Sequence, residues 1–198
     1  SQTLWIDRSG KDWKIKEGIT LDKDAENTEG FSDNNGFAYT IKNNLYLNKN
    51  GKVTQITNDS DEDIVNGQAV HQREFGITKG IFISPDNSKI AFYKMDQSMV
   101  ADYPIIDWSI TPAANKNIKY PMAGTPSHHV KLGIYDIKTN KTTILNIEGD
   151  REQYLTVITW NPDSKSVFVG VLNRDQNDLK MNQYNASTGS FMKTLFQE

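Results

Sequence analysis

The sequence predicts an all-β fold, and three observations lead to that prediction. Short runs of β-branched and aromatic residues recur along the 198-residue chain, each bounded by Gly, Pro, Asn, Asp or Ser. Two kinds of turn sequence repeat between these runs. No stretch keeps apolar residues at helical spacing for three turns. Strands joined by tight turns therefore account for the pattern, and helices do not.

The apolar runs predict the strands in order. Near the start, residues 4–7 and 13–15 predict a hairpin within residues 1–21. The clearest later strands are residues 37–41, 45–47, 90–93, 130–135, 167–171 and 181–184.

One turn sequence occurs three times between pairs of predicted strands. Its copies span residues 31–39, 83–92 and 160–168. Pro85 and Pro162 preset φ at the second turn position of two copies, and the Asp or Asn beside that position accepts local backbone hydrogen bonds. Each copy predicts a hairpin.

A second turn sequence follows each of these hairpins. Its copies span residues 47–53, 135–142 and 184–190. The pairs Asn50-Gly51, Thr139-Asn140 and Thr188-Gly189 suit the positive φ of hairpin connections. Two hairpins in succession make a four-stranded unit.

Four-stranded units that repeat at about 50 residues, with loops of varying length between them, are typical of β-propeller blades. We therefore expect a partial β-propeller of about three to four four-stranded antiparallel blades. A closed propeller needs at least four blades, so the chain is expected to be a fragment of a larger propeller. A self-contained β-sandwich is the alternative. The expected parts are 1–21 as the end of a blade, 22–63 as a blade, 64–148 as a blade with a long insertion at 97–129, and 149–198 as a blade.

Composition and charge exclude several classes of function. The net charge of −3 comes from interspersed acids and bases without a basic run, so nucleic acid is not expected as a partner. No stretch of roughly 18 apolar residues and no signal leader is visible, so no membrane-spanning segment is expected in this chain. Zero cysteines exclude disulfides, thiolate metal sites and cysteine nucleophiles.

The sequence offers no catalytic group of its own. A serine hydrolase needs Gly-x-Ser-x-Gly or another nucleophile with a base in reach, and none is present, so no residue is assigned a catalytic role. The spacing of His71, His128 and His129 does not support a metal site. The acidic residues 59–63 lack the Gly and the closing Glu of a calcium loop. We therefore expect neither a metal nor a cofactor.

Residues 70–76 are the most distinctive polar segment, because charged and polar side chains here separate two apolar runs. A carboxylate such as Glu74 can bind a peptide's terminal ammonium, and a guanidinium such as Arg73 can orient that carboxylate or grip a carbonyl group. His71, Gln72, Arg73 and Glu74 are thus the expected substrate-binding residues. The alternative is an exposed Arg-Glu pair on a blade edge.

The chain resembles the N-terminal propeller of the dipeptidyl peptidase IV branch of the prolyl oligopeptidase family of serine peptidases. Order and approximate spacing agree over nearly the whole chain, and the Tyr-Pro-x-Ala-Gly element at residues 120–124 is specific. The other matching residues are 37–39, 44–46, 64–67, 70–76, 84–86, 90–93 and 130–136.

The resemblance implies an eight-bladed propeller that caps a C-terminal α/β-hydrolase domain, which holds the catalytic triad and is absent from this chain. In the family, adjacent glutamates of a Val-Tyr-Glu-Glu-Glu segment hold the free N-terminus of peptide substrates. That segment corresponds to residues 71–74, where only Glu74 is retained. Gln72 and Arg73 stand where the family has its other two glutamates. Either Glu74 suffices, or another acid contributes, or the specificity differs.

The insertion at residues 95–124 resembles segments that border the active-site cavity and contribute to dimer contacts in the family, and its acids are Asp96, Asp102 and Asp107. By resemblance we expect a periplasmic or secreted protein, with bacteria as a plausible source. The leading hypothesis is a non-catalytic, substrate-gating and N-terminus-recognising propeller segment of a serine peptidase that removes N-terminal dipeptides. This chain is expected to be inactive by itself. The alternatives are a stand-alone propeller that binds proteins or carbohydrate, and a scaffold whose hydrolase domain is inactive.

Overall fold

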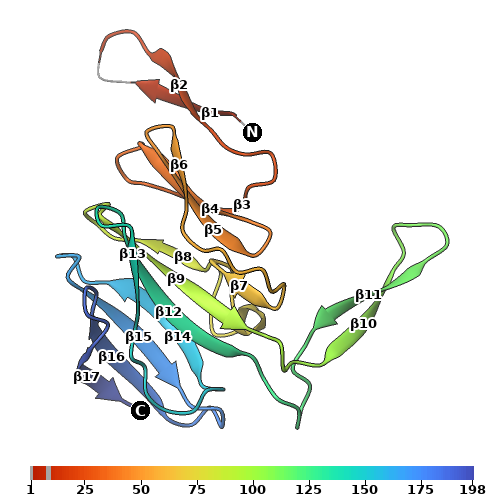
Figure 1. Ribbon diagram of the computed structural model, residues 1–198. Helices are drawn as coiled ribbons and strands as arrows, with labels where there is room; N and C mark the ends of the chain where they lie inside the picture. The colour runs from red at the N-terminus through yellow and green to blue at the C-terminus, as the bar shows by residue number, and fades with distance from the viewer. Residues whose placement is uncertain (1, 8–9) are drawn as a thin grey trace.

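The computed structural model describes residues 2–7 and 10–198 of the chain. It confirms the all-β prediction, because the described residues form strands β1 to β17 and contain no α-helix. Three larger antiparallel sheets lie side by side in chain order, and two separate hairpins extend from them (Figure 1). The three sheets form the partial β-propeller that the repeats predicted.

The first sheet contains four strands in the order in which the chain runs. These are β3 (Glu26–Gly30), β4 (Gly36–Ile41), β5 (Asn44–Lys49) and β6 (Lys52–Gln55). A separate hairpin precedes this sheet and consists of β1 (Gln2–Asp7) and β2 (Lys14–Thr20).

The second sheet is built around its central strand β9 (Lys89–Asp96). On one side β9 pairs with β12 (His129–Asp136), which pairs in turn with β13 (Lys141–Ile144). On the other side two short strands, β7 (Ile64–Asn66) and β8 (Ile81–Ile83), pair with different parts of β9. This edge of the sheet is therefore one strand interrupted by residues 67–80.

The third sheet again has four strands in chain order. These are β14 (Tyr154–Trp160), β15 (Ser166–Leu172), β16 (Leu179–Asn185) and β17 (Phe191–Gln197).

Apolar side chains between neighbouring sheets hold the sheets together. Leu45 and Leu47 of the first sheet share a buried cluster with Ile90 and Phe92 of the second. A larger cluster joins the second and third sheets and includes the buried Tyr93, whose hydroxyl donates to the Leu155 carbonyl at 2.8 Å. Burial of this apolar surface is the main stabilising contribution to the stack of sheets.

The first repeated turn has the same conformation in all three sheets. The tight turns begin at Phe31, Ser84 and Asn161. Three positions after each of these residues φ is positive, with 59° at Asn34, 57° at Asn87 and 58° at Ser164. Asn tolerates this left-handed region better than most residues, which explains two of the three copies. The second turn also has positive φ where expected, at Asn50, Asn140 and Gly189.

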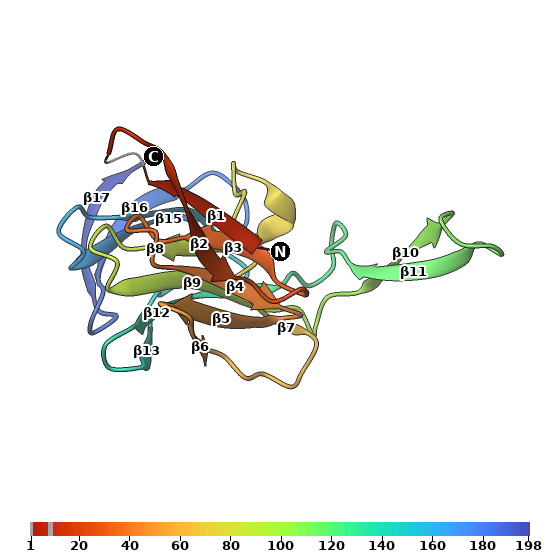
Figure 2. The same cartoon turned by 90° about the horizontal axis from the view of Figure 1, so that it is seen from above.

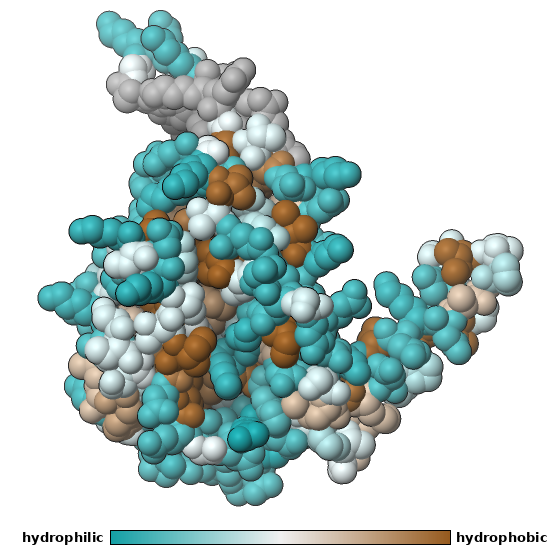
Figure 3. Space-filling model, viewed as in Figure 1, coloured by the Kyte–Doolittle hydropathy of each residue, from teal (hydrophilic) through white to brown (hydrophobic). Residues whose placement is uncertain are grey.

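The insertion between β9 and β12 contains a projecting hairpin, which we call the arm. It consists of β10 (Asp102–Asp107) and β11 (Ala114–Lys119) and extends away from all three sheets (Figure 2). Apolar and polar side chains alternate along its surface (Figure 3). Its exposed large apolar residues are Tyr103, Ile105, Ile106, Trp108 and Ile110.

A polar cavity between the second and third sheets

Residues 67–80, which we call the site loop, leave the second sheet at β7 and return to it at β8. Both ends of the loop pair with one residue, because Gly67 N–H donates to the Tyr93 carbonyl and Tyr93 N–H donates to the Gly80 carbonyl. At Gly80 the loop ends approach so closely that a Cβ atom would overlap the Gln68 backbone. Glycine here closes the base of the loop.

The loop carries a turn of left-handed backbone at residues 71–73. The φ angles are 52° at His71, 54° at Gln72 and 63° at Arg73, and the turn is closed by hydrogen bonds from Arg73 N–H to the Val70 carbonyl and from Glu74 N–H to the His71 carbonyl. Three successive side-chain-bearing residues in this region are unfavourable, at roughly 1–2 kcal/mol each. Such a conformation persists only where its surroundings impose it.

The surroundings that hold the turn are contacts of the His71 side chain, which is buried with 3% exposure. Leu155 N–H, in β14, donates to His71 Nε2 at 3.1 Å. The other ring nitrogen, Nδ1, lies 2.9 Å from Nε2 of the buried His128. Because a backbone N–H can only donate, His71 Nε2 carries no proton, and the neutral ring therefore donates from Nδ1 to His128. His128 accepts at Nε2 and carries its own proton on Nδ1.

Both histidines are neutral at pH 7. Burial, followed by the charges of His128 and Arg174, lowers the pKa of His71 to about 3. Burial, followed by Arg174 and His129, lowers the pKa of His128 to about 4, against a smaller opposing effect of Glu152. The neutral forms are those that the hydrogen-bond pattern requires.

A small cavity of about 180 Å³ opens beside this pair. Three groups of residues form its walls: the site loop, the segment that leads from the arm back to β12, and, in the third sheet, the start of β14 with the loop between β15 and β16. The lining residues are His71, Gln72, Glu74, Tyr120, Pro121, Ser127, His128, Tyr154, Arg174 and Gln176.

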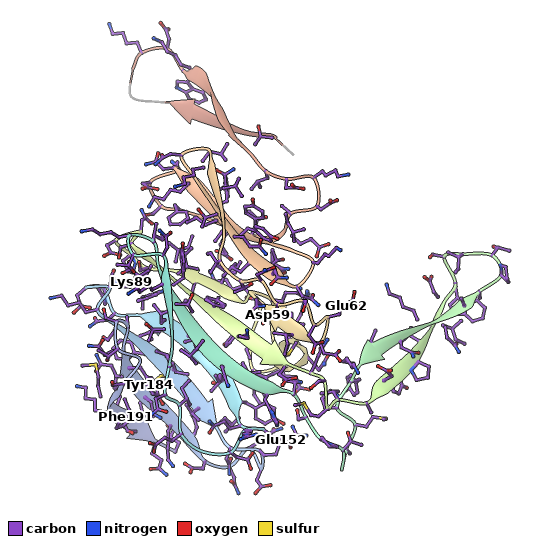
Figure 4. The ribbon with its side chains drawn as sticks, viewed as in Figure 1. Asp59, Glu62, Lys89, Glu152, Tyr184 and Phe191 are labelled. Carbon is purple, nitrogen blue, oxygen red and sulfur yellow. The ribbon has the colours of Figure 1, made fainter. Side chains whose placement is uncertain are left out.

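Arg174 places a positive charge on the wall formed by the third sheet. Its guanidinium donates a short hydrogen bond to the Tyr154 hydroxyl and lies over that ring, 5.4 Å from the centroid. Its Nε is 3.8 Å from Oε2 of Glu152, whose Oε1 accepts from Ser127 N–H at 2.8 Å. Glu152 lies at the end of the third sheet that faces the base of the arm (Figure 4). It thereby balances part of the Arg174 charge.

The structure brings together three of the four residues expected to bind substrate. His71, Gln72 and Glu74 line the cavity, and Arg73 does not. His71 is buried, whereas Gln72, Arg73 and Glu74 are all exposed. No ion pair joins Arg73 to Glu74 within the described part of the chain. Gln72 reaches the base of the arm, where its Nε2 donates to the Lys119 carbonyl at 3.4 Å.

The other polar candidates lie elsewhere. His129 lines a different cavity, of about 400 Å³, and in residues 2–7 and 10–198 no three His, Asp or Glu side chains form a group that could hold a metal ion. Of the acids in the insertion, Asp102 pairs with Lys119 at 3.4 Å. Asp96 and Asp107 each accept hydrogen bonds from a serine two residues later.

The acidic segment 59–63 is likewise engaged within the fold. Asp59 pairs with Lys94 at 2.8 Å and accepts a hydrogen bond from the buried Asn66, and these contacts lower the pKa of its carboxyl group despite burial. In the part of the chain that the structure describes, no helix is long and apolar enough to cross a membrane.

Sequence reasoning missed the wall formed by the third sheet. Arg174 and Tyr154 face the cavity only because β14 packs beside the site loop, a contact between positions about 80 residues apart in the chain, as the Leu155–His71 bond shows. Their sequence surroundings are an ordinary turn and an ordinary strand, which carry no signal of a shared site.

Fold and cavity together define the chain as a propeller segment with a small polar cavity between two of its blades. Residues 10–198 match the profile of the dipeptidyl peptidase IV (DPP IV) N-terminal region. The chain therefore belongs to the family of dipeptidyl peptidase IV N-terminal regions.

Individual relatives agree with this assignment. A candidate dipeptidyl-aminopeptidase B from Talaromyces marneffei is 32% identical over 72% of this chain and 18% of its own length. The crystal structure of a candidate dipeptidyl aminopeptidase IV from Bacteroides ovatus is 41% identical and superimposes with a TM-score of 0.87. The match covers 100% of this chain and 28% of the Bacteroides ovatus chain. Porphyromonas gingivalis dipeptidyl peptidase 4 has a TM-score of 0.83 and 25% identity, covering 93% and 27% respectively. The chain thus spans about a fifth of the length of the curated relatives, 18% and 22% for the first two.

Proposed function

We propose that this chain is the part of a dipeptidyl peptidase IV-like serine peptidase that admits peptides and holds their free N-terminus. The observation that carries the proposal is the position of Glu74 on the wall of a small cavity, within a chain of this family. A cavity of about 180 Å³ accommodates an amino-terminal residue and little more.

The charges around the cavity favour an ammonium group. The Glu74 carboxylate accepts charge-assisted hydrogen bonds from the N-terminus, and Gln72 beside it adds a neutral acceptor. His71 and His128 are uncharged, so they do not repel the ammonium group. Arg174 is balanced in part by Glu152 and can donate to the first carbonyl group of the peptide. Arg73, exposed outside the cavity, contacts the peptide where it emerges.

In this proposal a C-terminal α/β-hydrolase domain of a longer chain supplies the serine nucleophile. The fixed distance between Glu74 and that serine selects the second peptide bond, so the product is an N-terminal dipeptide. Exposed apolar residues on β14 and β17, among them Val157, Phe191 and Phe196, support further blades packing against the third sheet. The longer protein would be periplasmic or secreted, and a bacterial source fits the similarity to Bacteroides ovatus.

The arm suggests a second function, dimerisation. It projects from the blades and exposes Trp108 at 78% and Ile106 at 51%, which is unfavourable in water unless another surface covers them. A second copy of the protein is the proposed partner.

The decisive experiment uses Gly-Pro and Ala-Pro chromogenic amides with the full-length peptidase that contains this chain. We expect Glu74→Gln to lower kcat/KM at least about tenfold, because the substitution keeps the size of the side chain but replaces a charge-assisted hydrogen bond to the ammonium group with a neutral one. N-acetylation of the substrate removes the ammonium group and should lower wild-type activity similarly. Glu62→Gln, at an exposed glutamate outside the cavity, is the matched control and should have no effect.

Equal cleavage of acetylated and free substrates, or no cleavage of either, would overturn the proposal. The stand-alone binding module and the inactive scaffold are then the remaining interpretations.

A further inference from the structure

The buried histidine pair joins three separate parts of the cavity wall. His71 belongs to the site loop, His128 to the segment returning from the arm, and the Leu155 N–H to the first strand of the third sheet, which lies beside β12 (Figure 1). We infer that the neutral His71–His128 pair is the positioning device for Glu74, and that protonation of the pair releases the bound N-terminus. This inference rests on the proposed function.

The hydrogen-bond chain has one possible direction. Leu155 N–H donates to His71 Nε2, and His71 Nδ1–H donates to His128 Nε2. Each acceptor nitrogen is already used, so a second proton on either ring must be added at an occupied Nε2 atom. That proton would face the Leu155 N–H in one case and the His71 Nδ1–H in the other. Either event breaks a bond in a site where His71 is 3% and His128 is 4% exposed, and solvent cannot replace the bond there.

The same ring controls the backbone that carries Glu74. Glu74 N–H donates to the His71 carbonyl at 2.9 Å, and the Glu74 carbonyl accepts from Ile77 N–H at 3.0 Å. Within the turn that the first of these bonds closes, the backbone is left-handed at residues 71–73, a conformation that the local sequence alone does not favour. If the His71 ring leaves its place, the turn loses the buried side chain that anchors it to the third sheet, and Glu74 moves with the turn.

Tyr154 connects the pair to the opposite wall. Its ring contacts His71 edge-on, with centroids 5.1 Å apart, and packs against Phe75 at 4.8 Å. Since Tyr154 also accepts a hydrogen bond from Arg174, a displaced His71 disturbs both charged walls of the cavity.

Charged groups around the pair oppose its protonation. Arg174 faces both rings from the third sheet, and His129 lies next to His128, so both disfavour added positive charge, whereas Glu152 favours it less strongly. Tyr154 and the loop's own Arg73 and Glu74 are the remaining titratable neighbours. Burial is the largest effect and lowers the pKa of both rings, so the pair gains a proton only under acid conditions.

Two variants of His128 separate positioning from packing. The Gln side chain in His128→Gln offers an amide oxygen that accepts from His71 Nδ1–H but does not titrate, whereas His128→Leu removes the acceptor and retains apolar bulk. KM and kcat for Ala-Pro amide are measured from pH 7 to pH 4.5 in the full-length peptidase. At pH 7 we expect His128→Leu to raise KM on the order of tenfold with kcat within about twofold, and His128→Gln to restore KM.

The pH dependence provides the second readout. Wild-type KM should rise as the pH falls toward 4.5, and this rise should be several-fold smaller in His128→Gln. Titration of the substrate and of all groups other than His128 is common to both proteins and cancels in the comparison. Two controls separate this effect from unfolding. Activity should recover fully when the pH is returned to 7, and the circular dichroism spectrum should not change over the pH range.

Equal KM values for the Leu and Gln variants, or identical pH profiles for wild type and His128→Gln, would overturn the inference. If His128→Leu does not fold, the pH comparison decides by itself. The wild-type preference for free over acetylated substrate is measured in the same assay. If the wild type prefers the free substrate but His128→Gln has the wild-type pH profile, only the positioning role is refuted. If the wild type shows no preference for the free substrate, the proposed function and the inference are refuted together.

Discussion

At the scale of single residues, the site depends on side chains whose protonation state is set by burial. His71 has one ring nitrogen that must accept and one that must donate, and only the neutral form does both. An ionisable group held neutral in the folded state also makes folding depend on pH.

We predict that acid destabilises this protein earlier than carboxylate titration alone would. In the unfolded chain a histidine gains its proton near pH 6.5, whereas in the fold the pKa is about 3 for His71 and about 4 for His128. The stabilising effect is complete above about pH 6.5 and is lost as the pH falls toward 4, by up to about 1.4 kcal/mol per pH unit for each ring. Thermal melts from pH 7 to pH 5 measure it.

The variant His128→Gln is the control, because it leaves one titrating ring and should reduce the pH dependence of the melting temperature by about half. A melting temperature that is constant between pH 7 and pH 5 in the wild type would contradict the burial of neutral rings.

The sequence predicted some of these residues and could not predict others. Glu74 was identifiable because a carboxylate next to Arg73, between two apolar runs, is unusual and matches a family segment. The role of His128 was not identifiable, since its partner is 57 positions away and the two meet only through strand pairing and loop closure. The spacing of the histidines contained no information on which of them would be buried.

At the scale of elements, the site loop is an interruption of one sheet edge. Strands β7 and β8 pair with adjacent parts of β9, so that the loop leaves and rejoins the sheet at almost the same place. The apolar run at residues 90–93 predicted the partner strand β9. The interruption was not predicted, because local sequence does not reveal that two short runs share one partner strand.

We predict that Gly80→Ala opens the base of the site loop. The new Cβ would overlap the Gln68 backbone, which cannot move aside as a side chain can by changing rotamer. The free energy of unfolding should therefore fall by about 3 kcal/mol or more. Gly76→Ala is the matched control within the same loop. Gly76 has φ of +73° but open space around its Cβ position, so its substitution should cost only about 1 kcal/mol.

Denaturant unfolding of both variants provides the comparison. Peptide KM should rise in Gly80→Ala, because the loop ends also set the position of Glu74. Equal stability of the two variants would show that the ends of the loop separate at little cost.

At the scale of the whole molecule, the three sheets pack against one another and the arm projects away from them. Buried clusters connect each sheet to the next, whereas the arm has two strands and large exposed apolar side chains. A two-stranded hairpin is marginally stable in water by itself. Its length and apolar surface therefore indicate that it is completed by contact with another surface.

We predict that the full-length protein dimerises through the arm. Trp108, 78% exposed, is the largest apolar side chain available to such an interface, and aromatic residues of this kind contribute most of the binding energy at interfaces. Trp108→Ser should weaken the dimer by at least about 2 kcal/mol, or roughly thirtyfold in dissociation constant. Trp13, 65% exposed in the N-terminal part of the chain, provides the control Trp13→Ser, which should leave the dimer unchanged. Sedimentation velocity over a concentration series measures both variants.

Because Gln72 donates to the Lys119 carbonyl at the base of the arm, loss of the dimer should also raise peptide KM. A monomeric wild type, or a dimer equally weakened by both substitutions, would exclude the arm as the interface.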